Sequence, residues 1–539
     1  MMHERRVADA IVDVLEAGGV RHVFGIPGIH TLALYDALAE RPGIRHILPR
    51  HEQGAAFAAD GYARITRRHG VVSTTTGPGT FNTLSALAEA WSDSSPVLLL
   101  GGQIDAALLG LGKGVLHETV DQGRSFEAVT AFVGRPRSGP EIPAAVAEAL
   151  RCAMTGRNRP AYVELPTDLL DLPHPGAAPA VTLPGPVAAD PSQVVAAARL
   201  LAGARRPLLV PGQGVLRADA AAALRRLAAR LDAPVLTPIT GIGTVAADDP
   251  RWAGHMVPGQ PSTVALLEEA DAVLVVGLRL DDVETGRWSL PFRNVIQIDV
   301  DSAAIGRAYP VQAGIVGDAR LALEGLLDEL GAGPSATEDG WGAGRAKVAR
   351  DALHDAVPPA ARATRDAFLA ARAALPRDAI VTHDAARVNS WTGYIWPVYE
   401  PDGSHFPWGS ATLGFALPVA NGMAVAAPER RVVATCGDGG FLFTATELAT
   451  AVAHQLDVTV LVHDDAAFGS IAAYQERRYG KAYACDLVNP DLVLFGKSFG
   501  IPTERVLDIA ELPAAMARAT AEPGPSMVVL GTPLGQPFS

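Results

Sequence analysis

Short runs of apolar residues alternate with amphipathic stretches along most of this chain. Between residues 7 and 17 apolar side chains recur at helical spacing, and residues 32–38 repeat that pattern. Aliphatic and β-branched runs bounded by turn residues predict buried strands between such helices. In the first part of the chain these strands are expected at residues 23–28, 70–76, 97–100 and 161–166. Strands alternating with helices are typical of parallel sheets covered on both faces.

The same pattern occurs twice more, after two stretches that look like linkers. The linkers are the Pro/Gly/Ala-rich residues 173–189 and the glycine-containing residues 331–344. Further strands are expected at residues 207–210, 272–276, 295–300, 432–435, 458–462 and 527–530, with a helix at residues 220–231. The predicted fold class is therefore α/β, with three doubly wound parallel-sheet domains at residues 1–180, 190–330 and 350–539.

Chain length and charge agree with several enzyme-like domains. The chain has 539 residues, and a single hydrophobic core rarely grows past about 250–300 residues. Hydrophobic residues make up 48%, which is enough to bury large cores. There are 45 basic and 58 acidic residues, a net charge of -13, which disfavours a nucleic-acid-binding protein.

The number of cysteines and the length of the apolar runs indicate the cellular compartment in which the protein is expected. The 3 cysteines form neither a disulfide framework nor a zinc motif, which fits a reducing compartment. Residues 1–6 lead into the first predicted helix without the apolar core of a signal peptide. No apolar run reaches the length of a membrane span. We expect a cytoplasmic protein without a membrane or nucleic-acid partner.

A glycine-rich turn follows the predicted strand at residues 431–436. Residues 437–440 read Gly-Asp-Gly-Gly, and a predicted helix at residues 441–454 comes next. In this arrangement backbone N–H groups and a helix N-terminus face a phosphate, and glycine lets the backbone approach it. Asp438 alone would repel a phosphate. A divalent cation between them is therefore expected, because carboxylate oxygen is a hard ligand.

A second aspartate, Asp465, follows the next predicted strand. One strand–helix–strand unit separates it from Asp438, and ligands of parallel sheets gather at the carboxyl ends of the strands. We therefore expect both carboxylates at one magnesium ion, with a backbone carbonyl and diphosphate oxygens. The alternative is a plain tight turn at residues 437–440, with Asp464 and Asp465 capping the next helix. The spacing of the pair favours the metal site.

Glu52 is a candidate acid on a predicted helix in the first domain. Small residues surround it, in the run Glu-Gln-Gly-Ala-Ala. If that helix packs, the carboxyl group is desolvated and its pKa rises, so that it can share a proton. The alternative is a glutamate at a helix start, favoured only by the helix dipole. These residues alone leave the two interpretations even.

Together these motifs resemble those of thiamine-diphosphate-dependent enzymes. The resemblance rests on the 437–440 turn with Asp465, on the stretch around Glu52, and on the turns at residues 25–28 and 76–79. It covers almost the whole chain and is strongest to the acetolactate synthase-like branch, including 5-guanidino-2-oxopentanoate decarboxylases. It implies a pyrimidine-binding, a central and a diphosphate-binding domain, with thiamine diphosphate and Mg²⁺ as cofactors.

The resemblance also implies roles for individual residues. Glu52 would protonate the aminopyrimidine ring, and Asp438, Asp465 and the carbonyl of Ala467 would hold the metal. Leu413 would wedge the cofactor into a V shape, and the carbonyl of Ala411, where relatives often have glycine, would accept from its 4-amino group. Asp464 replaces the asparagine of many relatives at a position that is usually not a ligand. The implied cofactor-binding residues are Pro27, Glu52, Asn82, Arg387, Ala411, Leu413, Gly437, Asp438, Gly439, Gly440, Asp465, Ala467, Phe468 and Gly469.

The implied reaction is decarboxylation of a 2-oxo acid, with protonation or carboligation of the resulting enamine. Catalytic candidates are Glu52, His117 and Gln103, and the substrate pocket would contain His30, Phe81, Gln103, His117 and Phe468. For His117 a solvent-facing loop position is an equal alternative. Thr75 stands where benzoylformate decarboxylases carry a histidine, which disfavours that specificity.

Residues 277–282 resemble a flavin-contacting segment of acetohydroxyacid synthases, which raises FAD as an open question. Arg279 is the candidate contact, and an ordinary loop with a surface salt bridge is an equal alternative. A flavin-dependent oxidase and a non-catalytic relative are therefore the competing functions. The resemblance further implies a homodimer or homotetramer, because in the family one subunit supplies the glutamate and its partner supplies the metal site.

Overall fold

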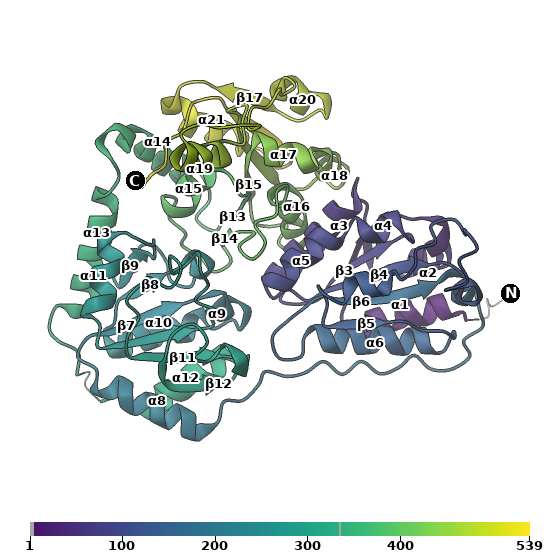
Figure 1. Cartoon of the computed structure of the whole chain (residues 1–539), viewed down its shortest axis with the longest axis horizontal. Helices are drawn as coiled ribbons and strands as arrows, with labels where there is room; N and C mark the ends of the chain where they lie inside the picture. The colour runs from purple at the N-terminus through teal and green to yellow at the C-terminus, as the bar shows by residue number, and fades with distance from the viewer. Residues whose placement is uncertain (1–4, 334–335, 539) are drawn as a thin grey trace.

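The chain folds into three units, each built on one parallel six-stranded sheet (Figure 1). The computed structural model describes residues 5–333 and 336–538. All pairs between neighbouring strands are parallel, and helices cover the sheets. The expected fold class, α/β with three parallel-sheet domains, is confirmed.

The first sheet has the order β2-β1-β3-β4-β6-β5. Its strands are β1 His22–Gly25, β2 Arg45–Ile47, β3 Gly70–Thr74, β4 Val97–Gln103, β5 Phe132–Gly134 and β6 Ala161–Pro166. Its helices are α1 Val7–Ala17, α2 Leu32–Ala39, α3 Glu52–Thr66, α4 Pro78–Phe81, α5 Leu84–Ser92, α6 Glu141–Ala153 and α7 Thr167–Leu170. The short strands β2 and β5 were not expected, because three residues are too few to show a periodic pattern.

The second sheet has the order β12-β11-β10-β7-β8-β9. Its strands are β7 Pro207–Pro211, β8 Val235–Thr237, β9 Trp252–His255, β10 Ala272–Val276, β11 Val295–Asp299 and β12 Val311–Val316. Its helices are α8 Pro191–Gly203, α9 Gln213–Arg217, α10 Ala221–Leu231, α11 Pro261–Glu269, α12 Ala319–Leu330 and α13 Ala346–Asp355. Strands β10 and β7 are buried throughout, as expected for the middle of a sheet that is covered on both faces.

The third sheet has the order β14-β13-β15-β16-β18-β17. Its strands are β13 Ile380–His383, β14 Ser404–His405, β15 Val432–Gly437, β16 Val458–His463, β17 Thr503–Val506 and β18 Ser526–Leu530. Its helices are α14 Arg362–Ala373, α15 Arg387–Tyr394, α16 Ala416–Ala426, α17 Asp438–Thr444, α18 Leu448–Ala453, α19 Gly469–Tyr479, α20 Leu492–Ser498 and α21 Leu512–Ala519.

The first and third units share one hydrophobic core, which contains Phe57 of α3 and Phe415 just before α16. Helices α3 and α16 lie side by side (Figure 1). A Cβ atom on Gly422 would lie 1.8 Å from the carbonyl oxygen of Ala58, and one on Gly61 would lie 2.3 Å from that of Val419. Only glycine lets two helix backbones come this close. The docking of the two domains therefore depends on these two residues.

Several predicted element bounds were wrong. The helix expected at residues 441–454 begins at Asp438 and is interrupted at residues 445–447 by a 3₁₀ turn. Strand β1 ends at Gly25, because Pro27 has no N–H to donate to a sheet, and β3 ends at Thr74 before the left-handed Gly77.

The two expected linkers differ from each other. The first forms a long connection between helices α7 and α8 (Figure 1). In the second, residues 334–335 lie outside the described residues. Its end is packed, because Trp341 is buried and its indole Nε1 donates to the carbonyl of Pro207 at 2.7 Å. In the ranges 5–333 and 336–538 no helix is long and apolar enough to cross a membrane.

Candidate active site

The diphosphate–metal candidates lie at one edge of the third sheet. Strands β15 and β16 are neighbours, and Gly437 pairs with His463 in their register. Asp438 therefore begins α17 at the end of one strand, while Asp465 follows the end of the next. The predicted convergence of the two aspartates at the carboxyl ends of adjacent strands follows from this register.

Asp438 lies in a buried, anionic setting. Its carboxylate accepts from the backbone N–H of Gly439 at 2.7 Å and from Asn489 Nδ2 at 2.6 Å. Burial raises the pKa of Asp438, and the nearby charge of Asp465 adds to the rise. Asp464 pairs with Arg505 at 2.8 Å and also accepts from Asn489 Nδ2 at 2.9 Å. Like charges held together in a buried place fit a cation between Asp438 and Asp465.

The side-chain donors alone do not make a complete metal site. Among the described residues, no group of three or more His, Cys, Asp or Glu side chains is arranged to hold a metal ion. A divalent cation at Asp438 and Asp465 would therefore need further oxygen ligands. The backbone carbonyl of Ala467 and the oxygens of a diphosphate are the ligands that the sequence motif implies, and Mg²⁺ accepts such a mixed set.

The glycines around this edge have no room for a side chain. A Cβ atom on Gly439 would lie 2.5 Å from Phe468 Cε1, and one on Gly469 would lie 2.5 Å from Asp465 Oδ2. Arg387 reaches the same place, because its Nη2 donates to the carbonyl of Gly469 at 2.6 Å. The Nε of Arg387 is buried and has no hydrogen-bond partner among the described residues. A cationic donor without a partner, beside Asp465, fits an anionic ligand such as a diphosphate.

Asp384, which the sequence did not single out, connects this edge to the predicted wedge. Its Oδ2 accepts from the backbone N–H of Gly414 at 3.0 Å, and burial raises its pKa to about 6. Thr444 Oγ1 donates to the carbonyl of Gly414 at 2.9 Å. These two bonds fix Gly414, the residue after Leu413, and so restrict where Leu413 can lie. The backbone of Gly414 is left-handed, with φ +79°. Ala411 is left-handed as well, with φ 50°, a conformation that glycine adopts more easily.

The pyrimidine-side candidates gather at the start of α3. Glu52 is the first residue of that helix, and its Oε2 accepts from Asn82 Nδ2 at 2.9 Å. Glu447 of the third domain accepts from the N–H groups of Arg50 and His51, each at 3.0 Å. The helix packs as expected, yet Glu52 is only half-buried, so one chain does not fully desolvate its carboxyl group. Pro27 is exposed at the end of β1.

His30 and His117 face each other, with ring centroids 5.3 Å apart. His30 is buried, and burial together with the neighbouring His117 lowers its pKa. His117 Nδ1 lies 3.1 Å from the carbonyl oxygen of Thr76, so this nitrogen carries the hydrogen. Glu118 fixes the loop by accepting from the N–H groups of Gly112, Gly114 and Val115. His117 is half-buried with its ring beside His30, and its role in a substrate pocket stays a prediction.

The pocket candidates Gln103 and Phe81 are bonded or packed within the first domain, whereas Phe468 lies in the third domain against Gly439. Gln103 donates to Glu164 Oε1 at 3.2 Å and accepts from the N–H of Ile104 at 2.9 Å. Phe81 stacks on Phe126, with centroids 6.2 Å apart. Gln122, which sequence reasoning missed, accepts from the N–H of Gly77 at 2.7 Å and so shapes the turn beside His117. Glu52 and Asp438 share no hydrogen-bond partner among the residues that the structure describes.

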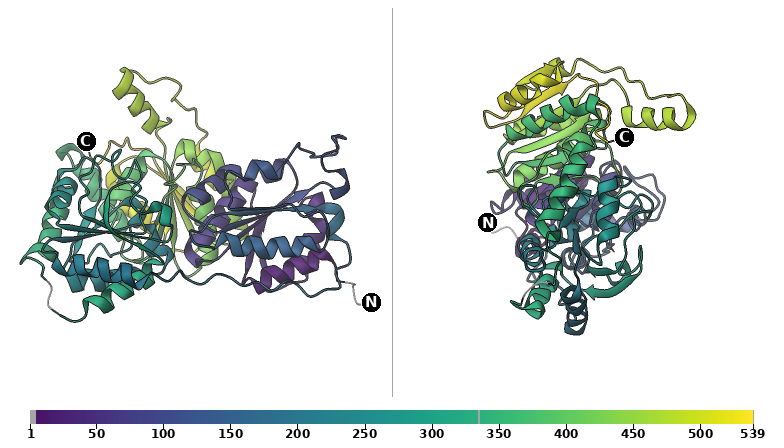
Figure 2. Two further views of the ribbon diagram at one scale, coloured as in Figure 1. Left: turned by 60° about the horizontal axis from the view of Figure 1, so that its bottom comes forward. Right: turned by 90° about the vertical axis from the view of Figure 1, so that its left-hand side faces the viewer.

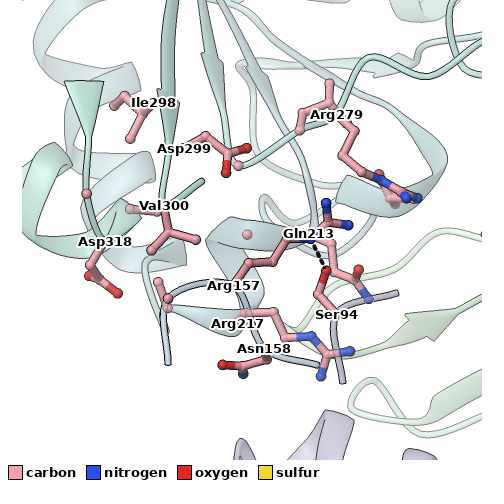
Figure 3. Close-up of a pocket in the computed structure, with 18 of the residues that line it drawn as sticks. Ser94, Arg157, Asn158, Gln213, Arg217, Arg279, Ile298, Asp299, Val300 and Asp318 are labelled. Atoms are coloured by element: carbon pink, nitrogen blue, oxygen red, sulfur yellow. Dashed lines mark hydrogen bonds between the residues drawn. The ribbon is translucent and has the colours of Figure 1, made fainter. Parts of the chain in front are cut away.

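A separate cavity of about 170 Å³ lies between the central sheet and the first domain (Figure 3). Arg157, Arg217, Arg279, Asp299 and Asp318 are among its lining residues. Arg279 is thus a cavity residue as well as a weak partner of Asp281 at 4.0 Å. The contact of Arg279 with a flavin stays a prediction.

Comparison with known proteins adds evidence across the whole chain. Three family models match: the N-terminal thiamine pyrophosphate (TPP) binding domain at residues 5–125, the central domain at 194–326 and the C-terminal TPP binding domain at 384–530. The chain is 36% identical to a "Probable 2-ketoarginine decarboxylase" of Pseudomonas aeruginosa, over 97% of this chain and 93% of that protein.

Two further relatives are similar over comparable lengths. A "Probable acetolactate synthase large subunit" of Methanocaldococcus jannaschii is 31% identical, over 95% of this chain and 89% of that protein. The "Acetolactate synthase isozyme 2 large subunit" of Escherichia coli is 32% identical, over 97% of this chain and 94% of that protein. These matches show that the chain belongs to the thiamine pyrophosphate enzyme family.

Proposed function

We propose that this protein is a thiamine-diphosphate-dependent enzyme that decarboxylates a 2-oxo acid and then protonates or carboligates the product. The observation that carries the proposal is the convergence of Asp438 and Asp465 at one sheet edge, in a chain that also presents Glu52 at a helix start. The similarity to a decarboxylase and to acetolactate synthases over nearly the whole chain supports it. The domain division proposed is 1–180, 190–330 and 350–539, and helix α13, which packs on β9 of the central sheet, spans the start of the last domain.

In this proposal Asp438, Asp465 and the carbonyl of Ala467 would hold Mg²⁺, which would neutralise the charge of the diphosphate. The partnerless Nε of Arg387 and the N–H groups at the start of α17 complete the anion site. When bound, thiamine diphosphate supplies the electron sink that takes up the electron pair of the broken C–C bond as carbon dioxide leaves. Leu413 and the carbonyl of Ala411 would orient the pyrimidine ring.

Side chains of the first domain would carry out the acid–base chemistry. Glu52 would keep a proton on the pyrimidine ring nitrogen. Asn82 bonds one oxygen of its carboxylate at 2.9 Å, which would leave the other oxygen for the ring. With Nδ1 of His117 directed at the carbonyl of Thr76, its Nε2 is the nitrogen that can exchange a proton with substrate. His30, whose pKa is lowered by burial, would stay neutral beside it.

We also propose that the active enzyme is a homodimer or homotetramer with sites at subunit interfaces. Two observations support this. Glu52 remains half-buried in one chain, although its role needs a desolvated carboxyl group. Helix α19 projects from the body (Figure 2), and Ile471 and Tyr474 on it are 53% and 65% exposed. A second copy would cover these apolar side chains. The three unpaired cysteines fit a reducing, cytoplasmic compartment.

Glu52→Gln tests the proposed function. The variant should bind thiamine diphosphate and Mg²⁺, because Asn82 and the diphosphate edge are unchanged. Its release of carbon dioxide from a panel of 2-oxo acids should fall by about 10²–10⁴-fold, the usual contribution of general acid–base catalysis. Product mass spectrometry with and without added aldehyde or pyruvate would separate decarboxylation from carboligation.

The matched control is Glu40→Gln, which removes an exposed glutamate of the same domain. It should leave carbon dioxide release unchanged. Equal turnover in Glu52→Gln and Glu40→Gln would overturn the role of Glu52. Absence of carbon dioxide release from every 2-oxo acid by the unaltered protein, loaded with both cofactors, would overturn the proposed reaction.

A further inference from the structure

A buried glutamate of the first domain, Glu89, binds a loop of the third domain. Glu89 lies on α5 and is 0% exposed. Its Oε1 accepts from the N–H groups of Gly409 and Ser410 at 3.2 and 3.3 Å. Its Oε2 accepts from the N–H of Thr412 at 3.2 Å and from its hydroxyl at 2.9 Å. One carboxylate thus accepts four hydrogen bonds across the domain boundary.

The loop that Glu89 binds carries two of the proposed cofactor contacts. Residues 409–413 contain Ala411, and Leu413 ends the loop. The N–H of Ala411 is bonded to the carbonyl of Pro407 at 2.9 Å, so the N–H groups of residues 409–412 all have partners. A Cβ atom on Gly409 would lie 1.9 Å from Ser92 Cβ, so the loop rests directly on α5. The left-handed Ala411 is therefore flanked on both sides by residues that Glu89 holds.

A buried ionic cluster that fixes α3 lies near Glu89, and the charges of Arg64 and Asp93 act on Glu89. Arg64 of α3 bonds Asp60 at 2.8 Å and Asp93 at 2.9 Å, and its Nη1 donates to the carbonyl of Phe406 at 3.1 Å. The side chains of this cluster are at most 2% exposed. The helix that presents Glu52 and the loop that presents Ala411 and Leu413 are therefore held by neighbouring buried groups.

We propose that Glu89 is a positioning residue that sets the conformation of the loop at residues 409–413. Through this loop it would set the position of the pyrimidine ring. The inference rests on the proposed function. A carboxylate suits this task because it is acceptor-only and can face four donors. Glutamine would offer one oxygen and would turn its NH₂ group toward two of those donors, which destabilises this loop conformation without emptying the space.

The first readout does not require a working enzyme. In cofactor-free Glu89→Gln, amide hydrogen exchange of residues 409–412 should be roughly tenfold or more faster than in the unaltered protein, the effect of losing one or two charge-assisted hydrogen bonds. Thr412→Val removes only the hydroxyl bond and should give a smaller increase. This second variant keeps the test open if Glu89→Gln folds poorly.

The matched control is Asp402→Asn. Asp402 also links the first and third domains, through Arg67 at 2.7 Å, but makes no contact with residues 409–412. Exchange of these amides in Asp402→Asn should equal that of the unaltered protein. Unchanged exchange in both Glu89→Gln and Thr412→Val, or equal acceleration in Asp402→Asn, would overturn the proposal.

The second readout connects the loop to the cofactor. With thiamine diphosphate and Mg²⁺ bound, Glu89→Gln should slow exchange of the thiazolium C2 proton about tenfold or more and lower kcat with little change in KM, because the pyrimidine ring is mispositioned. Unchanged C2 exchange despite a loosened loop would also overturn the proposal. Failure of the proposed function would appear separately, as unchanged turnover in Glu52→Gln.

Discussion

Replacing Arg64 with methionine would leave two buried acidic side chains, Asp60 and Asp93, without their cation. The Arg64 side chain is 1% exposed, and it bonds Asp60 at 2.8 and 2.9 Å and Asp93 at 2.9 Å. The charges of Asp60 and Asp93 raise the pKa of Arg64, against the effect of its burial. Methionine has a similar length and no charge, so the change removes the ion pairs and leaves the space largely filled.

The expected loss is large for a single substitution. Removing one partner of a buried ion pair costs about 3–5 kcal/mol, because the remaining charges stay out of water. Loss of the bond to the carbonyl of Phe406 adds about 1 kcal/mol. Typical domains are stable by only about 5–15 kcal/mol, so the docking of α3 should weaken markedly.

Native-state hydrogen exchange of the α3 amides measures this loss. A destabilisation of about 3–5 kcal/mol corresponds to exchange faster by roughly two to three and a half powers of ten. The loss should shrink as the pH falls from about 8 to about 5. Without Arg64, the folded pKa values of the buried carboxyl groups exceed their unfolded values, so protonation favours the folded state.

The matched control is Arg68→Met, just past the end of α3. The Arg68 side chain is exposed, so its loss should cost about 1 kcal/mol or less. Equal exchange in the two variants would refute the assignment of the Arg64 cluster as the anchor of α3. A pH-independent loss in Arg64→Met would refute the electrostatic explanation.

Two further predictions concern the central domain and the metal edge. Burial, followed by the charge of Asp281, raises the pKa of Glu284 to about 8, so its contribution to stability is present at low pH and is lost as the pH rises through that value. Glu284→Gln should therefore stabilise the central domain by a margin that grows from about pH 4.5 to about pH 8 and reaches roughly a few kcal/mol, whereas the exposed Glu268→Gln should show no such trend in urea unfolding. In Gly469→Ala the new Cβ would lie 2.5 Å from Asp465 Oδ2, so the Mg²⁺ concentration needed for cofactor binding should rise about tenfold or more by titration calorimetry. Gly535→Ala has open space around it and should not change that concentration, and an equal Mg²⁺ requirement in the two variants would contradict the placement of Asp465 at the metal.

Local regularities made much of the fold predictable. Continuous aliphatic runs such as residues 272–276 and 458–462 become central strands, because both faces of a parallel sheet are buried. The edge with Asp438 and Asp465 was predictable from connectivity, because a strand–helix–strand unit returns the chain to the same end of the sheet. Elements without a period, such as β2 and the break after α17, left no comparable signal.

Contacts between distant segments were decided only by the tertiary structure. Asn489 reaches Asp438, Asp384 holds Gly414 and Glu89 holds residues 409–412, yet none of these side chains has a local pattern that identifies its partner. The first two bonds form only when the third domain folds, and the bonds of Glu89 form only after the first and third domains have docked. Docking in turn depends on shape, as in the 1.8 Å approach that excludes a side chain at Gly422. The sequence by itself therefore determined the three sheets, the aspartate edge and the glutamate at a helix start. The folded chain decided how the start of α3 and the loop at residues 409–413 are held, because holding them requires surfaces that meet only in three dimensions.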